Sequence, residues 1–206
     1  MHRCNTLCYT DFIMMVKVKI CGVTSARDAI WASRCGADAL GFNFVPGTPR
    51  CCDPGRVKPI VMEMPPFVSA VGVFANARPD RVREIATECD LDYVQLHGRE
   101  SPYECTELKD LHVIKAFRVS DEDDLRELQR YDVEAFLLDA RVEGKLGGTG
   151  ESFRWEIGRG ARQHGPVILA GGLDPENVAK AIRTARPYAV DVASGVEDEP
   201  RSKDKD

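Results

Sequence analysis

The chain has 206 residues, of which 43% are hydrophobic and 30% are charged, and its formal net charge is −5. This length suits one domain with a substantial core and leaves little room for two independent domains. The basic residues are scattered and fewer than the acidic ones, so the sequence carries no electrostatic footprint for nucleic acid. We therefore expect a small-molecule partner.

The 8 cysteines are predicted to be free thiols. No secretory signal is visible, because the start MHRCNTLCYTDFIMM has no continuous apolar core, and no later segment reaches membrane-spanning length. These observations favour a reducing, cytoplasmic setting with no membrane partner. Cys51 and Cys52 are adjacent and no CxxC pair occurs, so no metal site is expected either.

Residues 1–15 show no clear periodicity and are predicted to be a tail before a single domain, 16–206. Within that domain, aliphatic runs of strand length alternate with charged segments of helical pattern. Such nearly all-apolar strands are typical of a parallel sheet covered on both faces. The predicted strands are 16–21, 37–43, 69–74, 93–96, 113–117, 135–139, 167–170 and 189–192. The helices predicted between them include 26–34, 80–88, 121–130 and 175–184.

Eight alternating units favour an α/β fold of the (βα)8 barrel type, although a doubly wound open sheet would give much the same pattern. The strand ends favour the barrel. Each predicted strand ends in polar or glycine-rich residues, and a barrel gathers all of these ends around one mouth. An open sheet would not bring them together.

The first strand places Cys21 at its end, followed at once by Gly22. Ligands bind at this edge of parallel α/β folds, so a thiol there is placed for chemistry. The alternative is a buried cysteine that acts as a small hydrophobe.

Asp139 ends the apolar run AFLL, where an acid is costly to bury without a role or a partner. We favour catalysis, with helix capping or a buried hydrogen bond as the alternative. The following segment, Arg141 to Glu151, is rich in glycine and is expected to be a mobile loop that closes over a substrate.

Two glycine-rich turns predict a phosphate site. Gly171 and Gly172 follow the seventh predicted strand and lead to Asp174, the expected start of a helix, while Ser194 and Gly195 follow the eighth strand. Glycines let backbone N–H groups approach an anion, and a helix N-terminus favours negative charge. The loops after the seventh and eighth strands are the usual phosphate site of such barrels.

Three further side chains are candidates for substrate contacts. Arg50, after the second strand, can clamp a carboxylate through its planar fork of donors, although a solvated loop arginine is the simpler interpretation. Gln95 and His97 lie at the end of the fourth strand. The histidine is either a proton carrier or an orienting hydrogen-bond partner.

Taken together, the chain resembles the phosphoribosylanthranilate isomerase family. The matching stretches run in order through nearly the whole body: VKICGVT, GADALGFNF, VGVFAN, VQLHG, FLLDA with GGTGESFRW, ILAGGLDPENV and VDVASGVE. The resemblance implies a tryptophan-pathway Amadori rearrangement of N-(5-phosphoribosyl)anthranilate to 1-(2-carboxyphenylamino)-1-deoxyribulose 5-phosphate, without a cofactor, in a monomer or homodimer.

The resemblance also implies roles for individual residues. Cys21 would be the general base and Asp139 the general acid, while Arg50 would hold the anthranilate carboxylate. Lys19, on the same side of the strand as Cys21, would favour the thiolate. The phosphate would rest on four residues with Asp191 nearby: Gly171, Gly172, Ser194 and Gly195.

The chain departs from the family at several positions. Thr48 and Ala193 stand where serine is usual and Arg154 where aspartate is usual, but none of these changes removes a catalytic group. The family usually continues into a last amphipathic helix, and we expect that helix to be missing here because the sequence stops after VASGVEDEPRSKDKD. We expect the tail or a second subunit to cover the barrel surface that this helix would otherwise shield.

Two other functions remain open. The related histidine-pathway isomerase performs the same rearrangement, but it has an aspartate at the end of the first strand, where Cys21 stands here. A barrel that has lost activity and only binds its ligand is the alternative from another class.

Overall fold

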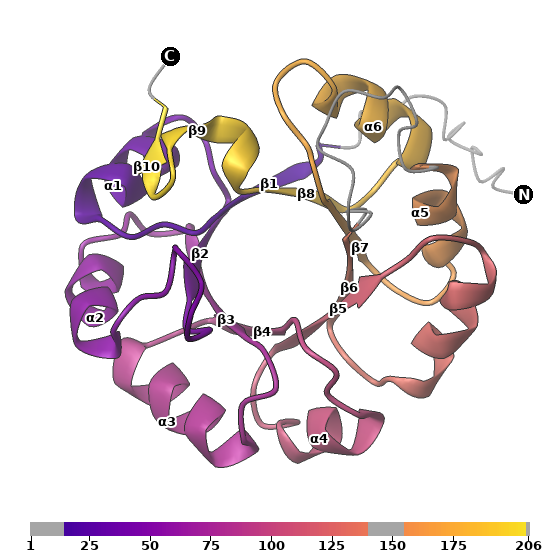
Figure 1. Cartoon of the computed structure of the whole chain (residues 1–206), viewed down its shortest axis with the longest axis horizontal. Coiled ribbons are helices and arrows are strands. Elements are labelled where there is room, and N and C mark those ends of the chain that lie inside the picture. Colours follow the sequence, from indigo (N-terminus) through magenta and orange to yellow (C-terminus); the bar gives the residue numbers. More distant parts are fainter. Residues whose placement is uncertain (1–14, 140–154, 205–206) are drawn as a thin grey trace, which may run out of the picture.

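The computed structural model describes residues 15–139 and 155–204. Eight parallel strands close into a barrel in the order β1 to β8, with the helices outside it (Figure 1), so the predicted (βα)8 barrel is confirmed. The strands are β1 (Lys17–Cys21), β2 (Ala39–Asn43), β3 (Ser69–Phe74), β4 (Tyr93–Leu96), β5 (Val113–Arg118), β6 (Ala135–Asp139), β7 (Val167–Ala170) and β8 (Ala189–Val192). The α-helices are α1 (Ala26–Arg34), α2 (Pro54–Met62), α3 (Pro79–Cys89), α4 (Pro102–Glu107), α5 (Trp155–Ala161) and α6 (Val178–Ala185).

The strands are buried on both faces, which explains their nearly continuous apolar sequences. Larger side chains, such as Phe42, Phe74 and Phe136, are buried in the layer between the barrel and its helices. Small and branched side chains form the cluster inside the barrel: Val71, Ile114, Ala116, Ala135, Leu137, Ile168, Ala170 and Ala189.

Side-chain caps begin several of the helices that follow the strands. The Ser25 side chain accepts a hydrogen bond from the Asp28 N–H at the start of α1, and the Asp53 side chain accepts one from Gly55 N–H at the start of α2. Ser101 and Glu104 form a reciprocal capping box at α4. These caps satisfy N–H groups that lack an intrahelical partner, and they fix where each loop at the mouth ends.

Two helix predictions need correction. The segment predicted as a helix over 121–130 is a 3-10 helix, η1 (Asp123–Arg130). The side chains of Asp121 and Asp124 accept hydrogen bonds from nearby backbone N–H groups, which compete with an α-helical start. Leu125 and Leu128 are both buried, and a spacing of three residues places them on one side of a 3-10 helix.

The helix predicted from residue 175 instead begins at Val178. Asp174 accepts hydrogen bonds through Oδ1 from the N–H groups of Glu176 and Asn177, both at 2.9 Å. This local turn holds residues 174–177 out of the helix, so the glycines after β7 do not lead straight into a helix N-terminus.

After β8 the described residues form a short 3-10 turn, η2 (Ser194–Val196), and an antiparallel hairpin of β9 (Glu197–Glu199) and β10 (Ser202–Lys203), but no α-helix. Val16, just before β1, and Val18, within it, are only partly buried against the cluster beneath α6. The tail expected to cover this face lies outside the described residues, so that expectation stays a prediction.

All cysteines of the described ranges are free thiols. No helix within those ranges is long and apolar enough to cross a lipid bilayer.

Candidate active site

Side-chain alternation along the strands places several of the predicted site residues on the inner face of the barrel. Asp139 follows Leu137 by two positions, Gln95 follows Tyr93, and Asp191 follows Ala189, and each earlier residue belongs to the cluster inside the barrel or packs against it. Side chains two positions apart on a strand share a face.

The same rule applies to Cys21, which follows Lys19 by two positions. Lys19 lies opposite Ala39, another residue packed against the inner cluster. Cys21 and Asp139 are also the last residues of β1 and β6, so the structure brings the predicted base and acid to one mouth.

Space for the Cys21 thiol comes from Gly41, its partner on β2. A Cβ atom at position 41 would lie 2.8 Å from the Cys21 sulfur and 3.1 Å from the Lys19 ammonium nitrogen. Any larger residue at position 41 would therefore displace both groups.

Beneath the thiol, Lys19 and Asp191 form a buried ion pair with Nζ 2.8 Å from Oδ1. Burial alone would lower the pKa of Lys19, but the charges of Asp191 and Cys21 outweigh it and the pKa is raised. Asp191, expected near the phosphate, thus has one carboxylate oxygen bonded to Lys19. The pair fixes the ammonium group next to the thiol.

Burial also raises the pKa of the Cys21 thiol, and the nearby charges of Lys19 and Lys203 oppose that rise. The predicted direction of the Lys19 effect on the thiolate is therefore correct, but burial is the larger influence. Burial therefore disfavours the thiolate of Cys21, and that thiolate is a stronger base once it forms.

Asp139 lies at the end of a side-chain series that starts in β4. The Gln95 amide Nε2 lies 2.8 Å from Nδ1 of His97, and Nε2 of that ring lies 3.4 Å from Oδ2 of Asp139. If the amide donates, the ring proton resides on Nε2 and faces the carboxylate. This geometry favours the orienting role of His97 over that of a proton carrier.

The two predicted phosphate loops contact each other directly. A Cβ atom at Gly195 would lie 1.9 Å from the carbonyl oxygen of Leu173, so only glycine allows the loop after β8 to approach the loop after β7. Gly171 and Gly172 have φ values of 88° and 66°, a region that favours glycine. No atom lies within 4 Å of a Cβ built on Gly172, which leaves that side of the loop open. Ser194 begins η2 beside them.

Arg50 is at the mouth, where its side chain contacts Glu197 and lies across Gly22. Sequence reasoning missed Glu197 and Lys203, which bind here from the C-terminal hairpin. The sequence offered one indication of Glu197, because this residue ends the stretch VDVASGVE that matches the family. The predicted mobile loop, Arg141 to Glu151, lies outside the described residues.

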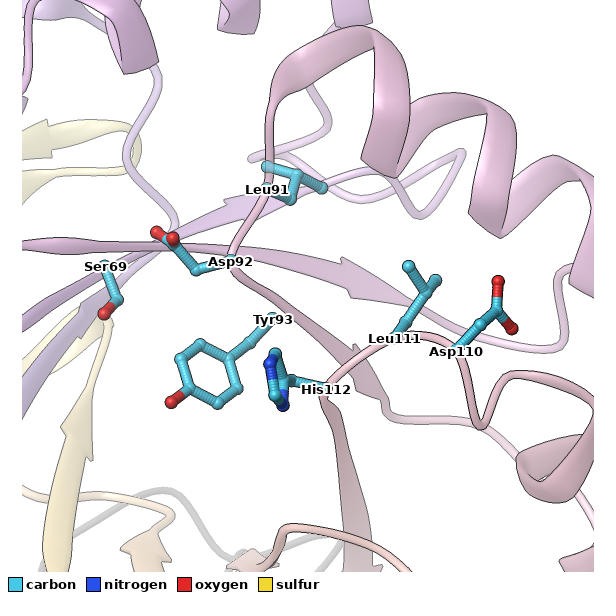
Figure 2. A pocket seen from close by; sticks show the side chains of 7 residues that line it. All are labelled: Ser69, Leu91, Asp92, Tyr93, Asp110, Leu111 and His112. Carbon is cyan, nitrogen blue, oxygen red and sulfur yellow. The ribbon is translucent and has the colours of Figure 1, made fainter.

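A surface depression with a volume of about 420 Å³ lies elsewhere, at the amino ends of β3 to β5. Figure 2 shows the rings of Tyr93 and His112 side by side there, with centroids 5.4 Å apart. His112 also contacts Glu134 at 3.0 Å. None of the predicted site residues lines this depression, so the candidate site is the mouth at the opposite end.

A closed barrel with a thiol, a carboxyl group and paired glycine loops at its mouth belongs to the class of (βα)8-barrel enzymes that act by acid–base chemistry on small molecules. Residues 18–206 match the family model described as "N-(5'phosphoribosyl)anthranilate (PRA) isomerase". This chain belongs to that family.

Known proteins of the same family are close in sequence and structure. N-(5'-phosphoribosyl)anthranilate isomerase of Geobacter sulfurreducens is 50% identical over 190 residues, which cover 92% of this chain and 93% of the relative. The crystal structure of phosphoribosyl anthranilate isomerase from Thermotoga maritima has a TM-score of 0.85 and 42% identity, with 93% and 94% of the two chains covered. A crystal structure of a phosphoribosyl anthranilate isomerase in complex with reduced 1-(o-carboxyphenylamino)-1-deoxyribulose 5-phosphate has a TM-score of 0.82 and 41% identity, with 93% of each chain covered.

Proposed function

We propose that this protein catalyses the Amadori rearrangement of N-(5-phosphoribosyl)anthranilate to 1-(2-carboxyphenylamino)-1-deoxyribulose 5-phosphate in L-tryptophan biosynthesis. The observation that carries the proposal is the shared mouth of Cys21 and Asp139, beside the paired glycine loops after β7 and β8. Membership of the isomerase family supports the same reaction.

In the first step, Asp139 acts as the general acid. Its carboxyl group donates a proton to the furanose oxygen while the C1–O bond breaks and the anthranilate nitrogen forms a double bond to C1. His97, held by Gln95, orients this carboxyl group. The product of the step is an open-chain Schiff base.

In the second step, Cys21 acts as the general base. The Schiff base makes the hydrogen on C2 acidic, and the Cys21 thiolate removes it to give an enolamine. Tautomerisation of the enolamine yields the C2 ketone and a C1 methylene group bonded to nitrogen. Lys19 stabilises the thiolate against the effect of burial.

Substrate binding uses the remaining residues of the mouth. We infer that Arg50 binds the anthranilate carboxylate and that Gly171, Gly172, Ser194 and Gly195 hold the 5-phosphate, with Asp191 acting through Lys19. Charged groups at both ends of the substrate then fix the sugar between Cys21 and Asp139. We infer that all of these residues belong to one barrel domain over 16–206, preceded by the tail 1–15. We propose that the protein acts in the cytoplasm as a monomer or homodimer.

The proposal is tested by measuring turnover of freshly generated phosphoribosylanthranilate through the loss of anthranilate-type fluorescence. We expect turnover by the wild type and its loss in both Cys21→Ala and Asp139→Asn. A wild type that binds a product analogue without turnover would instead identify a binding protein.

A further inference from the structure

The hairpin of β9 and β10 lies beside α1 and the end of β1 (Figure 1). It is tied to the first loop by a hydrogen bond of 3.1 Å from Thr24 Oγ1 to the carbonyl oxygen of Arg201. The chain therefore returns after β8 to the loop that carries Gly22.

Glu197, at the start of β9, forms a two-bond fork with Arg50. The Nε of Arg50 donates to Oε1 of Glu197 at 2.8 Å, and Nη2 donates to Oε2. The two side chains are 23% and 4% exposed. Burial acts to raise the pKa of Glu197, but hydrogen bonds from Arg50 and Lys203 lower it below its usual value, so the carboxylate is ionised.

Lys203, in β10, holds Glu197 against the barrel. Its Nζ donates to the carbonyl oxygens of Cys21 at 2.7 Å and Ala193 at 2.9 Å, and to Oε1 of Glu197 at 3.0 Å. These bonds engage all three N–H donors of a lysine. Lys203 thereby joins the ends of β1 and β8 to the carboxylate that binds Arg50.

A second contact fixes Arg50 from the opposite direction. Gly22 has φ of 75°, and a Cβ atom there would lie 2.3 Å from Cδ of Arg50. The aliphatic part of Arg50 thus lies directly on the Gly22 backbone, next to Cys21. With Glu197 on its guanidinium, Arg50 has little freedom to change rotamer.

We propose that Glu197 is a positioning residue that sets the guanidinium of Arg50 for the aromatic carboxylate of the substrate, with Lys203 as its anchor. This inference rests on the proposed function. Two cations and one anion meet here, so the cluster retains one positive charge for the single carboxylate of the ring. The Nη1 group of Arg50 makes neither bond to Glu197, and those two bonds fix its orientation for the substrate carboxylate.

Binding of two analogues tests this role. One is reduced 1-(2-carboxyphenylamino)-1-deoxyribulose 5-phosphate, and the other is the same molecule without the ring carboxyl group. We expect Glu197→Gln to weaken the carboxylated analogue about tenfold, on the scale of one charged hydrogen bond, and the other analogue less than twofold. In an Arg50→Ala background, Glu197→Gln should cause no further loss.

Glu199→Gln is the matched control, because Glu199 lies on the same hairpin but is exposed. It should change the affinity for neither analogue. Glu197→Asp keeps the charge and should fall between the wild type and Glu197→Gln. If Glu197→Gln does not fold, Glu197→Asp alone should still weaken only the carboxylated analogue.

Equal losses for both analogues would reduce Glu197 to a structural residue and overturn the proposal. An unchanged or tighter affinity for the carboxylated analogue would also overturn it, because Glu197 would then be idle or would compete with the substrate. The positioning role would be supported if Glu197→Gln weakens only the carboxylated analogue. If the wild type nevertheless shows no turnover, the isomerase function would be contradicted. Failure of the carboxylated analogue to bind the wild type would contradict both.

Discussion

Replacing Lys19 with methionine should destabilise the barrel strongly. The ammonium nitrogen lies 2.8 Å from Oδ1 of Asp191, and the side chains are 4% and 8% exposed. Removing one partner leaves a buried carboxylate uncompensated, which costs about 3–5 kcal/mol. For a domain of this size each kcal/mol lowers the melting temperature by about 2–4 °C, so we expect a drop on the order of 10 °C.

Thermal and urea unfolding, followed by circular dichroism, measure this effect. Lys17→Met is the matched control on the same strand, because its pair with Asp38 has side chains 49% and 33% exposed. Water screens exposed pairs, which contribute little to folding, so this variant should change stability far less than Lys19→Met.

A double variant completes the test. Lys19→Met combined with Asp191→Leu removes both buried charges and should recover most of the lost stability. The reasoning is refuted if Lys19→Met costs no more than Lys17→Met, or if the double variant is the least stable of the three.

Three other changes have defined outcomes. Gly195→Ala places a Cβ atom 1.9 Å from the carbonyl oxygen of Leu173, so the loops after β7 and β8 must separate. We expect the free energy of unfolding in urea to fall by about 1–3 kcal/mol and KM to rise. Burial raises the pKa of Cys21, so the fraction of thiolate grows as the pH rises toward that pKa. We therefore expect kcat/KM to increase from pH 7 to 9, and a flat profile would contradict Cys21 as the base. Arg201 follows Pro200 and has φ of 81°, a backbone conformation that is strained for residues other than glycine, so Arg201→Gly should add up to about 1 kcal/mol of stability. A loss of stability in urea unfolding would show that the Arg201 side chain stabilises the protein by more than this strain costs.

The strands could be predicted because their signal is local. Runs such as AFLL before Asp139 are apolar on both faces, and the structure places that strand at the predicted residues 135–139. The two helix errors arose where aspartate side chains bond to nearby backbone N–H groups. Asp121 and Asp174 each accept such bonds, and a periodicity of apolar residues carries no information about them.

The partners of the site residues were harder to predict. Cys21 and Asp139 could be selected from the sequence because each is a potential acid–base group at the end of an apolar strand, where parallel barrels bind their ligands. Glu197, by contrast, meets Arg50 across 147 residues of sequence, through a hairpin that has no strong strand pattern. A contact of this kind depends on how the closed barrel places its loops.

The hydrogen bonds of Lys203 have a consequence for how the protein folds during its synthesis. Lys203 binds the Cys21 carbonyl across 182 positions of sequence. On a ribosome β1 emerges early, but β8 and the hairpin emerge only after nearly the whole barrel has been synthesised. A nascent chain that ends at β8 would have the Cys21 thiol but would lack the lysine that fixes the adjacent backbone. Assembly of the proposed substrate-binding mouth is therefore among the last steps of folding as the chain is synthesised.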